Sequence, residues 1–222
     1  MSQELGRLAG LYVLADDDPR WKHGPVLQAR AACAGGAAVV QLRAKFATDR
    51  EALALAEEIR EITRQAGILF FVNDRFDLAL AAGADGVHLG QKDIPPRRVP
   101  EVARRNLLIG RSTHTAPQVA EARREPVDYI AFGPVFGTRS KASEYGARGV
   151  DLLAKIVRIA APCPVVAIGG TDSGSVSRVS RTGAAGFAVI SAVAGADDPI
   201  AATHELVDNW NATRKVTRGR AR

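Results

Sequence analysis

Short apolar runs recur along the chain and alternate with stretches of helical periodicity. The eight runs cover residues 11–15, 39–42, 68–72, 86–89, 107–110, 129–132, 165–168 and 187–190. Between them, small or apolar residues recur every three to four positions, most clearly in residues 49–66, where Thr48 or Asp49 supplies an N-cap. The pattern predicts eight strands, each followed by a helix.

This alternation predicts parallel strands joined by right-handed crossovers, and several runs are apolar on both faces, as a sheet covered by helices requires. An open doubly wound sheet and a closed barrel both satisfy the pattern. Eight units in about 210 residues favour closure, because open sheets of this size usually have five or six strands. No linker divides the chain, so we expect a single-domain α/β (β/α)8 TIM barrel over residues 1–211.

The formal net charge of +6 comes mostly from the end of the chain. The cations there are Arg214, Lys215, Arg218, Arg220 and Arg222. Without these five charges the net charge would be +1, and no aromatic residues are interleaved among them for stacking on bases. We therefore predict that residues 212–222 form a disordered basic tail, not a nucleic-acid arm, and that deleting residues 212–222 changes little.

Composition narrows the class of protein and its expected cellular location. The chain has 222 residues, of which 46% are hydrophobic and 24% charged, as in ordinary globular proteins. It lacks an apolar run long enough to cross a bilayer and shows no signal-peptide pattern, so we expect a cytoplasmic protein. Cys33 and Cys163 are too few for a disulfide scaffold or a cysteine zinc site.

Function in such a barrel lies at the carboxyl ends of the strands. In the second run, a period of two places Gln41, Arg43 and Lys45 on one face, and the apolar residues between them face the helices. Two cations and an amide directed toward the barrel mouth would suit a multiply charged anion such as a diphosphate. The alternative is an internal salt bridge to carboxylates at other strand ends.

Carboxylates follow the next two strands. Asn73 and Asp74 end the third run, and Asp93 lies shortly after the fourth. Two carboxylates at neighbouring strand ends suit Mg²⁺, which takes one or two of them together with phosphate oxygens and water. Each aspartate alone would also serve as a helix cap.

A second anion site is predicted across the mouth. The long connection at residues 133–149 carries Thr138, Ser140 and Lys141 and is interpreted as an anion clamp, with a solvated insertion as the alternative. The seventh run is followed by Gly169 and Gly170, and we expect residues 171–177 to open a helix. The eighth run ends at Ile190 and Ser191. Barrels commonly bind phosphate at these places through backbone N–H groups. Two separate anion sites at the barrel mouth predict two phosphorylated reactants.

The histidines are too scattered for a zinc site. We expect His88 to pack within the barrel, whereas His114, after the fifth run, is equally open to catalysis and to packing. The chain lacks a nucleophile elbow and a G-x-G-x-x-G turn after the first strand, which argues against a hydrolase and a nicotinamide enzyme.

An ordered set of motifs resembles the thiamine-phosphate synthase family over nearly the whole chain. The motifs are LYVLAD, VQLRAK, VNDRFDLALAAGADGVHLGQKD, IGRSTHT, DYIAFGPVFGTRSK, VVAIGG and AVISA. The resemblance implies a cytoplasmic transferase that joins hydroxymethylpyrimidine diphosphate to hydroxyethylthiazole phosphate with Mg²⁺, releasing diphosphate through an ionised pyrimidine intermediate. Its partners would be these two small molecules, without nucleic acid or membrane; a homo-oligomer stays open.

The resemblance also implies roles for individual residues. It assigns the diphosphate of the pyrimidine substrate to Gln41, Arg43 and Lys45, and makes Asn73 a contact to the pyrimidine or its diphosphate. Mg²⁺ is assigned to Asp74 and Asp93, and the leaving group to Ser112 and Lys141. The thiazole phosphate is assigned to Thr138, Ser140, Gly170, Ile190 and Ser191. The catalytic residues it implies are Arg43, Lys45, Ser112 and Lys141.

Three positions depart from the family pattern. Arg111 stands where a small apolar residue is usual and is shared with the related thiazole tautomerase, Gly137 replaces a proline, and Ser140 replaces a threonine. The alternatives are therefore a tautomerase or a non-catalytic barrel that binds thiamine precursors. Gln41 and Asp93 favour the synthase, because an enzyme that binds no diphosphate does not need the full set of cations and metal ligands.

Overall fold

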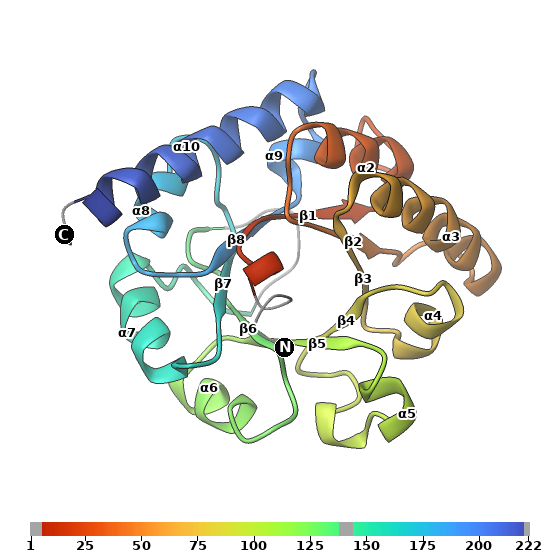
Figure 1. The fold of residues 1–222 in the computed structure, drawn as a ribbon, viewed down its shortest axis with the longest axis horizontal. Helices are drawn as coiled ribbons and strands as arrows, with labels where there is room; N and C mark the ends of the chain where they lie inside the picture. The colour runs from red at the N-terminus through yellow and green to blue at the C-terminus, as the bar shows by residue number, and fades with distance from the viewer. Residues whose placement is uncertain (1–5, 138–143, 220–222) are drawn as a thin grey trace.

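The strands form a closed parallel barrel in the computed structural model, which describes residues 6–137 and 144–219 (Figure 1). They run in chain order around the barrel, and β8 pairs with β1. The strands are β1 Gly10–Asp16, β2 Val39–Arg43, β3 Leu69–Asn73, β4 Gly86–Leu89, β5 Leu108–Thr113, β6 Tyr129–Phe132, β7 Val165–Ile168 and β8 Gly186–Val189. The predicted (β/α)8 barrel is confirmed.

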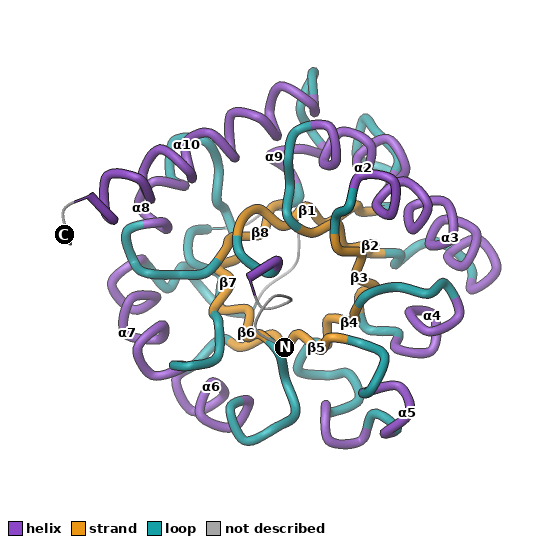
Figure 2. Tube along the Cα trace, in the orientation of Figure 1, coloured by secondary structure: helices purple, strands orange, loops and turns teal. Residues whose placement is uncertain are grey.

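Helices surround the barrel on its outside (Figure 2). They are α2 Pro25–Ala34, α3 Asp49–Ala66, α4 Phe76–Ala81, α5 Glu101–Arg104, α6 Ala116–Ala122, α7 Val150–Ala160, α8 Val176–Ser180, α9 Ser191–Ala194 and α10 Pro199–Gly219, with a 3-10 turn η1 at Pro96–Arg98. Within the described ranges, no helix is both long and apolar enough to span a membrane.

Helix α3 shows how closely local sequence specifies these elements. Thr48, one of the two predicted candidates, is its N-cap. It forms a capping box in which Glu51 N–H donates to the Thr48 side chain and Thr48 N–H donates to the Glu51 side chain. The helix buries a stripe of side chains that includes Ala56 and Ile59. Its C-cap is Gly67, whose φ of 69° is a left-handed conformation that favours glycine.

Each strand has an inner and an outer face, which pack into two separate cores. Val40 and Leu42 of β2 pack outward against the helices, whereas Tyr12, Phe71 and Tyr129 fill the barrel interior. The aromatic rings need space there: a Cβ at Gly110 would lie 2.2 Å from the Tyr129 ring. Side chains therefore fill the barrel interior below the carboxyl ends of the strands. The polar side chains of the inner faces gather at those carboxyl ends.

The expected disordered tail is largely helical. Helix α10 continues to Gly219, so residues 212–219 do not form the separate appendage that their charge suggested, and residues 220–222 lie outside the described ranges. Arg214 donates to the carbonyl of Ala184 at 3.1 Å and lies over the Trp210 ring, 5.3 Å from its centroid. The Arg214 guanidinium thus makes two contacts within the folded protein, which a count of charges does not detect.

Two truncations would test this anchoring. Ending the chain after Asn211 removes the hydrogen bond and the cation–π contact of Arg214, which together contribute about 1–2 kcal/mol, whereas ending it after Lys215 keeps both. We expect the first truncation to lower the thermal unfolding midpoint by roughly 2–8 °C and the second to leave it nearly unchanged. Equal midpoints for the two truncated proteins would show that Arg214 is not an anchor.

Candidate active site

A cavity of about 370 Å³ opens at the carboxyl ends of the strands. Its floor is made of inner-core side chains such as Leu14, Val166 and Ala188, and its rim is polar. Ten of the residues predicted from the sequence line it: Gln41, Arg43, Lys45, Asn73, Asp74, Asp93, Ser112, Gly170, Ile190 and Ser191. Thr138, Ser140 and Lys141 lie outside the described residues.

Arg43 is held by a carboxylate that the sequence reasoning did not single out. Its Nη1 donates to both oxygens of Asp16, at 3.1 and 2.9 Å, and the Asp16 side chain is fully buried. The two residues are register partners on β1 and β2. The internal salt bridge left open as an alternative is thus present, but it uses only Nη1, and Arg43 still lines the cavity.

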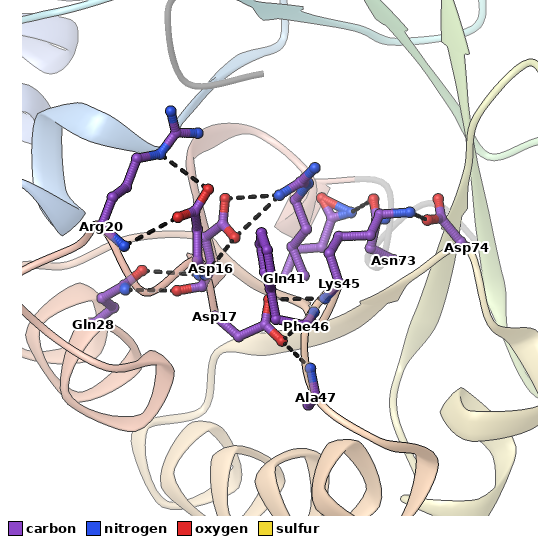
Figure 3. Close-up of polar contacts among 12 residues, drawn as sticks. Asp16, Asp17, Arg20, Gln28, Gln41, Lys45, Phe46, Ala47, Asn73 and Asp74 are labelled. Atoms are coloured by element: carbon purple, nitrogen blue, oxygen red, sulfur yellow. Dashed lines mark hydrogen bonds and ion pairs between the residues drawn. The ribbon is translucent and has the colours of Figure 1, made fainter. Parts of the chain in front are cut away.

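Lys45 is positioned by a second aspartate at the end of β1. The carboxylate of Asp17 accepts the backbone N–H groups of Lys45, Phe46 and Ala47 at 2.7 to 2.9 Å, which fixes the turn after β2 (Figure 3). From this turn, the Lys45 ammonium reaches across the rim to form an ion pair with Asp74. Gln41 donates to Asn73 in the same row at 3.3 Å.

The carboxylates of Asp74 and Asp93 interact with each other at the cavity rim. The pKa of Asp74 is raised, first by burial and next by a side-chain hydrogen bond with Asp93, while Lys45 opposes the shift. Asp93 accepts the backbone N–H of Gly90 at 2.6 Å. Asp74 also adopts a φ of 68°, a left-handed conformation that aspartate tolerates better than most residues and that recurs at functional sites.

This donor set fits Mg²⁺. Across residues 6–137 and 144–219, no group of three or more His, Cys, Asp or Glu side chains gathers into a complete metal cage. Mg²⁺ does not need one, because it takes one or two carboxylates and completes its shell with phosphate oxygens and water. Two adjacent carboxylates that repel each other are also a favourable place for a divalent cation.

Ser112 is held at the cavity wall by a histidine and a tyrosine. His88 is buried, as expected, and its ring stacks on Tyr129. One ring nitrogen lies 2.7 Å from the Tyr129 hydroxyl and the other 2.8 Å from Ser112 Oγ. Burial, and next the charge of Asp128, raise the pKa of Tyr129, so its hydroxyl remains protonated. His88 therefore combines packing with the positioning of a cavity hydroxyl.

Arg111 and His114 occupy different surroundings. Arg111 is not among the cavity-lining residues; it is buried on the outer face of β5, and its Nη1 donates to the Gly90 carbonyl at 2.6 Å. His114 does line the cavity, stacks on Tyr145 at 4.4 Å and contacts the Gly133 carbonyl at 2.6 Å. Arg111, the residue shared with the thiazole tautomerase, thus does not line the cavity.

The opposite side of the mouth offers backbone groups. Gly169 and Gly170 follow β7 with φ values of 100° and 68°, and a Cβ at Gly170 would lie 2.2 Å from the Gly137 carbonyl. Ile190 and Ser191, where α9 begins, line the same cavity. The Thr171 hydroxyl, not singled out from the sequence, is buried and has no hydrogen-bond partner among the described residues.

Residues 171–177 lead into helix α8, as expected, although the helix itself begins only at Val176. Asp172 accepts the backbone N–H of Ser175 at 2.9 Å, and Ser175 Oγ accepts the backbone N–H of Asp172 at 2.9 Å. The Val176 N–H also donates to the Asp172 carbonyl at 3.0 Å, so the connection after β7 is a turn that leads directly into α8.

A closed barrel with a reactive rim at the carboxyl ends of its strands is the arrangement of a (β/α)8-barrel enzyme acting on small molecules. The family described as thiamine monophosphate synthase matches residues 11–193. The thiamine-phosphate synthase of Anaeromyxobacter dehalogenans is 46% identical over 94% of this chain and 90% of its own, and that of Methanoculleus marisnigri is 44% identical over 92% and 96%. The chain belongs to the thiamine-phosphate synthase family and is accordingly a transferase.

Solved structures agree with this assignment. The thiamine phosphate pyrophosphorylase from Pyrococcus furiosus has a TM-score of 0.83 at 40% identity, covering 94% of this chain and 98% of that one. A 3-hexulose-6-phosphate synthase, with a TM-score of 0.62 at 15% identity over 90% and 99% of the two chains, shares the fold alone. The resemblance read from the sequence motifs is confirmed.

Proposed function

We propose that this chain joins hydroxymethylpyrimidine diphosphate to hydroxyethylthiazole phosphate, giving thiamine phosphate and diphosphate, with Mg²⁺ held by Asp74 and Asp93. The observation that supports this most is the row formed by Arg43, Lys45, Asp74 and Asp93 along one side of the cavity rim. Cations and metal-type carboxylates in one row suit a diphosphate leaving group, whereas a proton transfer between thiazole tautomers requires neither.

The proposed reaction breaks the bond between the pyrimidine methylene carbon and the diphosphate oxygen, and both electrons leave with the diphosphate. Bound Mg²⁺ would supply charge neutralisation of that leaving group. Arg43, Lys45 and the Ser112 hydroxyl would hold the diphosphate oxygens as their charge increases, and we assign Lys141 the same role. The lone pair of the thiazole nitrogen then forms the new C–N bond.

The second substrate would occupy the opposite side of the mouth. The backbone groups of Gly170, Ile190 and Ser191 line the cavity there, and we assign its phosphate to them together with Thr138 and Ser140. The apolar floor and the buried Tyr129 and His88 would keep water away from the ionised pyrimidine, which water would otherwise trap.

An assay of the purified protein tests this proposal. With both substrates and Mg²⁺ we expect thiamine phosphate and diphosphate in equal amounts, and no product after chelation with EDTA until Mg²⁺ is restored. Conversion of the thiazole tautomer alone would identify a tautomerase, and binding of the substrates without turnover would identify a carrier. Either result would contradict the proposal.

The partners we propose are these two small molecules, without nucleic acid or membrane, and a homo-oligomer is left open. A cytoplasmic location also stays a prediction; both cysteines are free, which agrees with a reducing compartment.

A further inference from the structure

The turn that carries Asp93 is tied to the neighbouring strand β5 at two points. Gly90 and Asp93 close the turn, because the Gly90 carbonyl accepts the Asp93 N–H at 3.2 Å and Asp93 Oδ2 accepts the Gly90 N–H at 2.6 Å. Gln91 Nε2 donates to the backbone carbonyl of Ser112 at 2.5 Å. Arg111, the residue before Ser112, donates from Nη1 to the Gly90 carbonyl at 2.6 Å.

Arg111 is an unusual residue to find in this place. It is 8% exposed and lies on the outer face of β5, yet within the described part of the chain no carboxylate lies within ion-pair distance of it. A buried cation without a counter-charge lowers stability. Its side-chain hydrogen bond goes to the one carbonyl that also closes the Asp93 turn.

We infer that Arg111 is a positioning residue for the metal site: it holds the turn Gly90–Gln91–Lys92–Asp93 so that the Asp93 carboxylate faces Asp74. This inference rests on the proposed function for the identity of the metal. Arg111 itself is not among the cavity-lining residues, so we assign it no contact with substrate. Its position beneath the rim lets it act on Asp93 only through the backbone of Gly90.

If Arg111 positions a metal ligand, its replacement should affect metal affinity and stability differently, which replacement of a purely structural arginine would not. Arg111→Met keeps the length and packing of the side chain, removes the buried charge and removes the hydrogen bond to Gly90. Replacing an unpaired buried charge by an apolar side chain is neutral or stabilising, whereas loss of a group that orients a metal ligand weakens metal affinity roughly 10–100-fold. Stability and metal affinity should therefore separate.

The metal affinity can be measured directly as the binding of Mn²⁺ in the presence of inorganic diphosphate, with the free ion detected by electron paramagnetic resonance. Mn²⁺ suits the same carboxylate and water ligands as Mg²⁺. We expect the Kd for Mn²⁺ to rise roughly 10–100-fold in Arg111→Met and to recover partly in Arg111→Lys, which keeps a cationic donor. Thermal unfolding of Arg111→Met should be unchanged or shifted upward.

Arg105→Met is the matched control, because the Arg105 side chain is mostly exposed and pairs with Glu101 one helical turn away, far in the sequence from the turn that carries Asp93. It should leave the Kd for Mn²⁺ unchanged. An Arg111→Met protein that binds Mn²⁺ like the wild type, or that does not fold, would overturn the inference while leaving the proposed coupling reaction intact. A wild type that binds Mn²⁺ but forms no thiamine phosphate would instead overturn the proposed function, and one that binds no Mn²⁺ would overturn both.

Discussion

Asp93→Ala should reduce the rate of thiamine phosphate formation by roughly 10²–10³-fold while the barrel stays folded. The change removes one of two carboxylates that would hold Mg²⁺ against the departing diphosphate, and removing one preorganised group from such a site has effects of this size. It removes no core contact, since Asp93 lies on the cavity rim. Steady-state product formation and thermal unfolding of the purified variant are the measurements.

Two companion variants define the cause. Asp93→Asn retains an oxygen that accepts the Gly90 N–H but loses the negative charge, so it should keep the turn and still be slow. Asp77→Ala removes a carboxylate of the α4 first turn that pairs with Arg75, away from the cavity, and should keep normal turnover. Near-normal turnover of Asp93→Ala would contradict the metal assignment.

Arg43→Met should lose both activity and stability. Asp16 is fully buried and would be left without its counter-charge, which costs about 3–5 kcal/mol in free energy of unfolding. Loss of a cation at the diphosphate position should also slow product formation by roughly 10²-fold or more. Urea unfolding and the coupling assay measure the two effects separately.

A double variant separates these two roles of Arg43. Asp16→Asn combined with Arg43→Met removes the uncompensated charge, so much of the lost stability should return while activity does not. Arg64→Met, which breaks an exposed ion pair with Glu61 on α3, should change stability by less than about 1 kcal/mol. An active double variant would show that Arg43 serves the fold and not the reaction.

Much of the fold is predictable because its signals are local. The strands Gly86–Leu89, Tyr129–Phe132 and Val165–Ile168 have the limits expected from their apolar runs. Helix α3 also begins and ends where predicted, with Thr48, one of the two candidates, as its cap. The inward direction of Gln41 and Arg43 follows from a period of two once the outer face of β2 is known to be apolar.

The features that the sequence reasoning missed depend on neighbours that are distant in the chain. Asp16 meets Arg43 through the register of two parallel strands, and Arg111 reaches Gly90 across β4 and β5. Neither register can be deduced from one strand alone. The helical Arg214 segment was missed because its contact with Trp210 is not visible in a count of charges.

A crystal structure with Mg²⁺ and inorganic diphosphate would test the central claim most directly. It should show the ion within roughly 2.0–2.1 Å of oxygens from Asp74 and Asp93, and diphosphate oxygens bound to both the ion and the side chains of Arg43 and Lys45. Diphosphate bound elsewhere, or an ion that contacts neither aspartate, would contradict the account.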